Sequence, residues 1–373
     1  MIWLALPALA AAAYYLLAIV ATVRWPRSHR PRAQASVPAP LSILKPIHGR
    51  DPRFYEAIRS HAAQDYPQFE ILFGVSDPSD TALQDIARLQ SEFPARSIAV
   101  FAVATKAPNA KVGVLAELAK HARYPLLLVN DSDIEVEPGY LRAVAAPLDD
   151  PTIGMVTCLY RGLGESWASG AEALGIATEF TPSVLVARLL GVVEFALGST
   201  MMFRAAALRK IGGFESIAGY LADDYQLGNR IHALGYRIEF APIVVETDLG
   251  AESWAQTWRH QVRWSRTIRV SHPAGYYGCI VTHATLWALV AFAAGQWWAG
   301  AAALGLRMAA GILAGVLLRD RHVARYFWLI PLRDLFGFAV WIAGALGSTV
   351  YWRDRKLALH RDGRIDVEAY NGN

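Results

Sequence analysis

The sequence contains little charge and almost no cysteine. Only 18% of its 373 residues are Asp, Glu, Lys or Arg, whereas 54% are hydrophobic. This composition is too apolar for an ordinary soluble enzyme, so we expect part of the chain to lie in lipid. The two cysteines, Cys158 and Cys279, lie far apart in the sequence. They exclude a disulfide framework and a cysteine metal site, and they favour a reducing compartment.

A long basic run is also missing. The formal net charge is only +4, and the arginines cluster beside apolar segments instead of forming one basic tract. This pattern suits the surface of an anionic membrane, and it argues against nucleic acid as a partner.

The first apolar run covers residues 2–23 and is followed by the basic stretch RWPRSHRPR. It is long enough to cross about 30 Å of hydrocarbon as a helix. Because the basic residues follow the apolar run, we do not expect a cleaved signal peptide. The positive-inside rule then places residue 24 onward in the cytoplasm.

Apolar sequence returns after Pro273, with candidate spans at 279–298, 299–318 and 326–350. Pro331, Arg333 and Asp334 interrupt the last of them, and basic residues flank it on both sides. We therefore interpret the last segment as a re-entrant or interfacial helix. The predicted domains are an N-terminal anchor (1–24), a cytosolic α/β domain (39–273), a C-terminal membrane region (274–352) and a basic tail (353–373).

Between the membrane segments, short apolar runs alternate with polar helical stretches, as in an α/β domain. Helix-like segments such as FYEAIRSHAAQ and ALQDIARLQSEF separate the first runs. We therefore expect parallel strands joined by right-handed crossovers, with a ligand site beyond the carboxyl ends of the strands. The expected strands are 41–47, 69–76, 97–103, 125–131, 153–160 and 237–247.

Acidic residues follow two of these strands. Asp131 and Asp133 come directly after the apolar run PLLLV, where they suit Mg²⁺ or Mn²⁺ bound to a diphosphate, although turn or cap acids would look the same. In GVSDPSD, Asp77 is placed to accept a hydrogen bond from a nucleobase or ribose. Asp80, in the same turn, is expected to be solvated.

A third acidic pair opens the helical stretch LADDYQLGNRIHALG. Asp223 and Asp224 there are either helix-capping acids or include a general base that deprotonates an acceptor hydroxyl.

The segment WRHQVRWSRTIR interleaves arginine with tryptophan just before the membrane region. Its members suit a pyrophosphate, although an interfacial amphipathic helix has the same composition. Lys45 and Lys111 are weaker candidates, because each is a single cation near a predicted sheet edge. The basic and aromatic members of the segment are Arg259, Arg263, Arg266, Arg269, Trp258 and Trp264.

These motifs, in the order LKP, DYP, GVSD, NAK, DSD, ADDY and RW, resemble the ceramide glucosyltransferase family over nearly the whole chain. The resemblance implies a Rossmann-like GT-A domain, the fold of transferases that use nucleotide-diphospho-sugars. It implies a uridine-binding Asp77, metal and diphosphate binding by Asp131 and Asp133, and Asp224 as the base. Lys111 is a further candidate donor-binding residue, and Arg263 and Trp264 would hold the diphosphate or close the site.

The sequence departs from the family's basic motif at His260, where Gln or Arg is usual. The bacterial branch of the resemblance includes hopanoid-associated enzymes that add N-acetylglucosamine to a bacteriohopanetetrol side chain. The apolar stretch between the metal motif and the base is either the floor of an acceptor site or an ordinary core helix. The candidate acceptor contacts are Glu179, Glu194, Asp223 and His260.

The resulting prediction is an inverting glycosyltransferase at the cytoplasmic face of the inner membrane. Its expected partners are a UDP-sugar donor, a lipid acceptor and the membrane, and its expected cofactor is a divalent metal ion, Mg²⁺ or Mn²⁺. A processive polysaccharide synthase is the alternative enzyme, but two clean C-terminal spans with Arg307 as their conspicuous charge do not favour a polymer pore. A membrane scaffold or receptor is the alternative that is not an enzyme.

Overall fold

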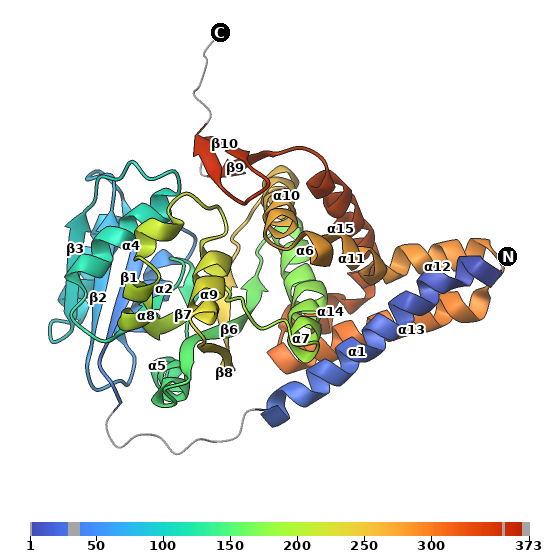
Figure 1. Ribbon diagram of the computed structural model, residues 1–373, viewed down its shortest axis with the longest axis horizontal. Helices are drawn as coiled ribbons and strands as arrows, with labels where there is room; N and C mark the ends of the chain where they lie inside the picture. Colours follow the sequence, from blue (N-terminus) through green and yellow to red (C-terminus); the bar gives the residue numbers. More distant parts are fainter. Residues whose placement is uncertain (1, 29–37, 353–354, 368–373) are drawn as a thin grey trace, which may run out of the picture.

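The computed structural model describes residues 2–28, 38–352 and 355–367. An α/β body lies beside a group of long apolar helices, and the N-terminal helix α1 packs along α13 in that group (Figure 1). The first and last parts of the chain therefore meet in the helical region.

The body is built on an eight-stranded sheet in the order β3-β2-β1-β4-β7-β6-β8-β5. β1, β2 and β4 are buried along their whole length, as expected of apolar runs covered on both faces. The strands are β1 (Leu41–Ile47), β2 (Phe69–Val75), β3 (Ser97–Ala102), β4 (Leu126–Val129), β5 (Ile134–Glu135), β6 (Ile153–Leu163), β7 (Met201–Arg204) and β8 (Arg237–Asp248).

The sheet is mixed, so the prediction of parallel strands was right only in part. β3, β2, β1 and β4 are parallel, but β7 runs antiparallel to both β4 and β6, and β5 runs antiparallel to β8. The sequence prediction missed β7, because its four residues lie inside a long apolar stretch. Because β7 runs antiparallel to β4, the residues just before β7 lie at the same edge of the sheet as the residues just after β4.

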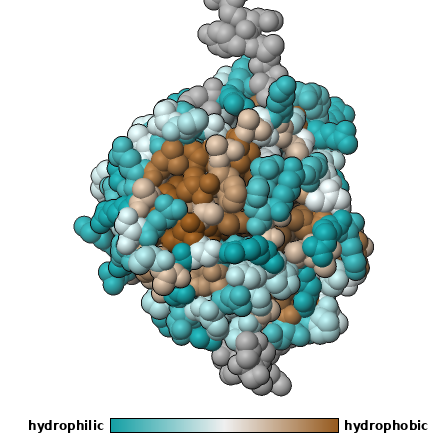
Figure 2. Space-filling model, turned by 90° about the vertical axis from the view of Figure 1, so that its left-hand side faces the viewer, coloured by the Kyte–Doolittle hydropathy of each residue, from teal (hydrophilic) through white to brown (hydrophobic). Residues whose placement is uncertain are grey.

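β3 is the outermost strand on its side of the sheet, and Val100 in it is 37% exposed. The face of the molecule on that side carries an apolar area framed by hydrophilic residues (Figure 2). Apolar surface is therefore not confined to the helical region.

Helices cover both faces of the sheet. α4 begins at Asn109, whose side chain accepts a hydrogen bond from the Val112 N–H, and α10 begins with a reciprocal cap between Ser253 and Gln256. The helices of the body are α2 (Phe54–Ala62), α3 (Ala82–Glu92), α4 (Ala110–His121), α5 (Tyr140–Ala145), α6 (Trp167–Gly175), α7 (Thr181–Leu189), α8 (Ala205–Lys210), α9 (Asp223–Ala233) and α10 (Trp254–Ser271). A π-helical turn, η3 (Ile176–Phe180), joins α6 to α7.

Within the described residues, three helical stretches are long and apolar enough to cross a membrane, at 3–25, 297–318 and 321–345. A fourth stretch, 273–293, is bent by 47° near His283. The bend thus lies in the segment that we expected to be an uninterrupted span. The helices are α1 (Leu6–Ser28), α11 (Pro273–Gly278), α12 (Ala284–Ala293), α13 (Trp297–Leu318), α14 (Arg321–Tyr326) and α15 (Ile330–Ala345).

The charges inside the helical region are paired. Arg307 of α13 is fully buried and donates to the carboxylate of Asp334 in α15, at distances of 2.6 to 3.0 Å. Its remaining nitrogen donates to the Thr178 carbonyl at 2.9 Å. Arg333 contacts Glu179 at 3.3 Å and Gln261 at 2.9 Å. The charges that interrupt the last apolar segment therefore hold α15 to α13 and to the body.

A small sheet follows α15, in a region that the sequence suggests only as a basic tail. Its strands are β9 (Thr349–Trp352), β10 (Arg355–Leu359) and β11 (Ile365–Val367). The Ile365 N–H donates to the Gly219 carbonyl at 2.8 Å, and the Leu221 N–H donates to the Gly363 carbonyl at 3.2 Å. Leu221 also packs in the apolar cluster of this sheet. The sheet therefore holds the loop that leads into α9.

Candidate active site

Two predicted acidic residues converge on Lys111, itself a predicted residue, at the carboxyl edge of the sheet. Lys111 lies in the first turn of α4, Asp131 follows β4, and Asp223 is the first residue of α9. The Lys111 Nζ lies 2.8 Å from Asp131 Oδ1 and 3.1 Å from Asp223 Oδ2. Burial lowers the pKa of Lys111, but Asp131 and Asp223 outweigh it, and the net shift is upward. Lys111 is therefore a buried cation of the cluster, not an ordinary surface lysine.

Asp224 joins the cluster through Gly198, a residue that the sequence did not single out. The Gly198 N–H donates to Asp224 Oδ2 at 3.1 Å. A Cβ at Gly198 would lie 3.4 Å from that oxygen and 3.6 Å from Asp131 Oδ2. The two carboxylates therefore flank the same glycine, which is brought there by the antiparallel course of β7. In the sequence, the only sign of this close contact between backbone and carboxylates is the run of small residues GST directly before MMF.

The environment of Asp224 suits a group that accepts a proton. Burial and then Asp223 raise its pKa to about 6, against the effect of Lys111. Its Oδ1 also accepts the Tyr225 N–H at 2.7 Å, so the capping role that we considered is present as well. A carboxylate with this pKa is mostly deprotonated at neutral pH and binds a proton more readily than an ordinary aspartate.

Asp133 lies beside Asp131 and accepts a hydrogen bond from the Thr247 hydroxyl. Burial and then the charge of Asp131 raise its pKa to about 6. Lys45 is fully buried beneath them, and its Nζ donates to the Asp131 carbonyl at 3.0 Å. Burial lowers the pKa of Lys45 to about 7, although the carboxylates oppose the shift. Two neighbouring carboxylates, one of which raises the proton affinity of the other, form a donor set that fits Mg²⁺ or Mn²⁺.

Asp77 follows β2 and is exposed at the same edge of the sheet. Its Oδ1 accepts from the hydroxyl and the N–H of Ser79 at 2.7 and 2.8 Å, and these bonds lower its pKa. Asp80 differs from our prediction of a solvated residue. It accepts from the Gly49 N–H at 2.7 Å and from the Ala82 N–H at 2.9 Å, so it joins two loops.

The arginines of α10 divide into two groups. Arg266 and Arg269 donate to backbone carbonyls at the end of α15, including those of Leu346 at 2.9 Å and Ala345 at 2.6 Å. They therefore cap that helix, so two of the four arginines that suit a pyrophosphate donate to backbone carbonyls in this structure. The guanidinium of Arg263 lies 5.9 Å from the ring centre of Trp352.

Trp264 packs between His260 of its own helix and Phe180 of η3. Its ring centre lies 4.5 Å from that of His260 and 6.5 Å from that of Phe180. Phe180 in turn lies 5.4 Å from Tyr160. Burial raises the pKa of Tyr160, and the charges of Asp224 and Glu172 add to the effect. Tyr160 therefore lies between the carboxylate cluster and a separate group around His260.

The candidate acceptor residues have different surroundings. Asp223 is part of the Lys111 cluster, as described above. Glu179 contacts Arg333, and Glu194 Oε2 accepts the N–H of its neighbour Val193 at 2.9 Å. His260 Nδ1 lies 2.8 Å from Glu172 Oε1. The contacts described for Glu179, Glu194 and His260 thus lie outside the carboxylate cluster.

A cavity of about 510 Å³ opens beside this edge, between the ends of β6 and β8 and the start of α14. Its wall includes Arg161 and Glu246, which form an ion pair. Glu246 precedes Thr247, the hydrogen-bond partner of Asp133. The cavity therefore adjoins both the sheet edge and the end of a candidate membrane span.

Comparison with known proteins identifies the family. Residues 2–365 match the profile described as "Glycosyl transferase family 21". Ceramide glucosyltransferase 3 of Caenorhabditis elegans is 28% identical over 231 residues, which are 60% of this chain and 49% of that protein. The probable glycosyltransferase YdaM of Bacillus subtilis (strain 168) is 24% identical over 233 residues, 61% of this chain and 54% of that protein. The chain spans about half the length of these curated relatives. The matches confirm the resemblance to ceramide glucosyltransferases.

A solved structure confirms the fold. The mannosyltransferase PcManGT from Pyrobaculum calidifontis, determined in complex with GDP-Man and Mn²⁺, is similar with a TM-score of 0.55 and 19% sequence identity. The similarity covers 92% of this chain and 97% of that one. The expected GT-A fold with added apolar helices is therefore present.

Proposed function

The chain belongs to glycosyl transferase family 21, and we propose that it transfers a hexose or N-acetylhexosamine from a UDP-sugar to the hydroxyl of a membrane lipid. The observation that carries the proposal is the convergence of Asp131, Asp223 and Asp224 around Lys111 and Gly198. Ceramide and a hopanoid such as bacteriohopanetetrol are the two acceptors that the family resemblance suggests.

In this proposal the acceptor oxygen attacks the anomeric carbon from the face opposite the UDP group. The bond from that carbon to the diphosphate oxygen breaks, UDP leaves with the electron pair, and the configuration inverts. Asp224 accepts the acceptor's proton, which suits its raised pKa and its position on the rigid start of α9. No covalent intermediate with a protein nucleophile is needed.

Asp131 and Asp133 would hold the divalent ion, which supplies positive charge to the leaving diphosphate. Lys111 adds a fixed cation beside Asp131. Asp77 would bind the uridine part of the donor, and Arg263 with Trp264 would contact the diphosphate or close the site. These assignments follow the family resemblance and the placement of the residues.

The apolar helices would keep the acceptor close to the sheet edge. A lipid leaves the bilayer only at a cost of about 0.8 kcal/mol per CH₂ group, so a site at the membrane surface lets its hydroxyl group alone reach water. The cavity at the start of α14 supports this arrangement, because it joins the sheet edge to the end of a candidate span. The basic residues after α1 favour a catalytic domain on the cytoplasmic side of the inner membrane.

The test is UDP release by the chain purified in detergent. UDP-glucose and UDP-N-acetylglucosamine are each combined with ceramide and with bacteriohopanetetrol, in Mn²⁺ and in excess chelator. We expect release that requires one lipid and the metal, with one sugar added per lipid by mass spectrometry. A growing glycan would instead identify a processive synthase, and release that is independent of every lipid would refute the proposed acceptor class.

A further inference from the structure

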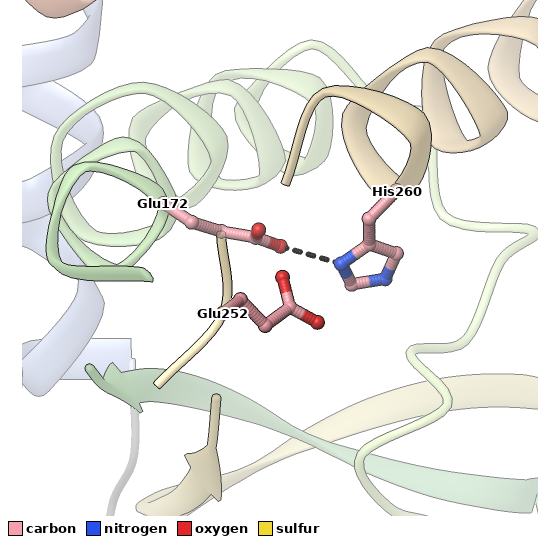
Figure 3. A group of neighbouring side chains, drawn as sticks. All are labelled: Glu172, Glu252 and His260. Atoms are coloured by element: carbon pink, nitrogen blue, oxygen red, sulfur yellow. Dashed lines mark ion pairs between the residues drawn. The ribbon is translucent and has the colours of Figure 1, made fainter. Parts of the chain in front are cut away.

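A second group of ionisable side chains lies apart from the carboxylate cluster. Glu172 comes from α6, Glu252 from the segment before α10, and His260 from α10 itself. Their side chains point toward one another, and the carboxylate oxygens and the imidazole nitrogen all lie within 4.8 Å of one another (Figure 3). Three separate segments of the chain therefore present metal-ligand atoms to one point.

Glu172 is the least expected member of this group. Its side chain is 0% exposed, and no residue in the described ranges donates a hydrogen bond to either of its carboxylate oxygens. Among the described residues, the one basic group that contacts this carboxylate is the imidazole of His260, with Nδ1 2.8 Å from Oε1. A buried carboxylate without donors is costly unless a cation lies beside it.

The second carboxylate increases this need for positive charge. Glu252 is half-buried and accepts from the Thr257 hydroxyl at 3.3 Å. Burial and then the charge of Glu172 raise its pKa. The charges of His260 and Arg263 oppose this shift, so beside a neutral imidazole the two carboxylates carry one more charge than Arg263 balances.

The donor atoms select the kind of cation. Two carboxylate oxygens and one imidazole nitrogen suit Zn²⁺ and similar transition-metal ions, whereas Mg²⁺ and Ca²⁺ prefer oxygen ligands alone. Ligands of one zinc ion lie up to about 4.2 Å apart, because each bond is about 2.1 Å long. Atoms within 4.8 Å need only small side-chain rotations to share an ion.

We propose that Glu172, Glu252 and His260 bind one divalent transition-metal ion of the Zn²⁺ type, at a site separate from Asp131 and Asp133. The ion fastens α10 to α6. Because the His260 ring packs on Trp264, it also fixes the position of that indole. The site is a positioning device, and its existence does not depend on the proposed sugar transfer.

Zn²⁺ itself is the probe. The full chain is purified in detergent with Asp131→Asn and Asp133→Asn, which removes the other carboxylate pair, and is then stripped with chelator. Isothermal titration is expected to show one tight Zn²⁺ per chain and no Mg²⁺ at the same site. Co²⁺ in place of Zn²⁺ is expected to give the visible absorption of a site with nitrogen and oxygen ligands.

In that background His260→Gln, which installs a residue usual in the family, is expected to weaken Zn²⁺ binding at least about 100-fold. The matched control is His360→Gln, since His360 also contacts a carboxylate, Asp366 at 2.7 Å, but at an exposed position. It is expected to leave binding unchanged.

Absence of stoichiometric Zn²⁺ binding in the background protein would overturn the proposal, as would equal binding by the His260→Gln protein. If His260→Gln fails to give a folded protein, as judged by thermal melting without metal, Glu252→Gln takes its place. Weaker Zn²⁺ binding by the Glu252→Gln protein would then support the site, and unchanged binding would overturn it.

Discussion

The helical region and the carboxyl edge of the sheet both gather charged side chains, and they differ in how those charges are balanced. In the helical region Arg307 and Asp334 satisfy each other, and Thr178 accepts the remaining donor. At the sheet edge, Asp131, Asp133, Asp223 and Asp224 gather around Lys45 and Lys111, so acids outnumber bases. A balanced pair needs nothing further and holds helices together. An excess of carboxylates needs a cation or a proton, which is the condition for a site that binds metal and accepts protons.

Asp224→Asn tests the unbalanced region most strongly. We expect kcat to fall about 10²- to 10⁴-fold, because the amide cannot take the acceptor's proton. The amide oxygen can keep only one of the two N–H partners of Asp224, those of Gly198 and Tyr225, so the melting temperature should fall only slightly. UDP release and thermal melting in detergent measure the two effects. Asp366→Asn, an exposed change of the same kind, serves as control, and full activity of Asp224→Asn would remove this residue as the base.

Asp334→Leu breaks the balanced region. It leaves Arg307 buried without its carboxylate, and we expect a loss of about 3–5 kcal/mol in stability. Adding Arg307→Met should recover most of that loss, because no lone charge remains. Melting followed by tryptophan fluorescence in detergent measures both.

An exposed pair provides the contrast. Arg364 and Asp362 lie 3.5 Å apart with both side chains more than half exposed, so Asp362→Leu should not change the melting temperature measurably. If the single change at Asp334 were equally silent, the buried pair would not be what joins α13 to α15.

The pH dependence of activity sharpens the comparison further. Asp224 is active when deprotonated and its pKa is raised to about 6, so kcat/KM for the acceptor should fall as pH drops through 6, by about tenfold per unit below it. Asp133 has a similarly raised pKa and acts in the same direction, because protonation removes a metal ligand. Excess Mn²⁺ should move the loss of activity that is due to protonation of Asp133 to lower pH. It should leave the loss that is due to protonation of Asp224 unchanged. A rate that rises toward acid pH would contradict both roles.

Gly198→Ala is the mildest change. Its methyl group would lie in ordinary contact with Asp131 and Asp224, at 3.6 and 3.4 Å, so the fold should persist. The group occupies space between the two carboxylates, and we expect a severalfold loss in kcat/KM with little change in melting temperature. Gly170→Ala, which meets nothing within 4 Å, is the control. Equal activity of the two variants would show that the space beside Gly198 is not used.

The sequence predicted most of the sheet and much of the cluster, for identifiable reasons. Short apolar runs bounded by polar segments, such as Leu41–Ile47, favour buried strands, and acids just after such strands lie at their carboxyl edge. The direction of β7 could not be predicted, since it depends on which neighbours a four-residue strand pairs with. Glu172 lies in an apolar helix and meets His260 only through tertiary packing. Asp334 interrupts a hydrophobic segment, and its partner Arg307 lies on another helix.

The small sheet after α15 also bears on the order of events during folding. Gly219 and Leu221, just before the acids of α9, hydrogen-bond to Ile365 and Gly363. These partners follow every apolar helix in the sequence, and contacts so distant in sequence are expected to form late because closing the intervening loop costs entropy. The loop that leads into α9, and so to the proposed base, is therefore expected to be among the last parts to be completed. A chain still being inserted into the membrane would hold its donor-side residues in place before it could use them.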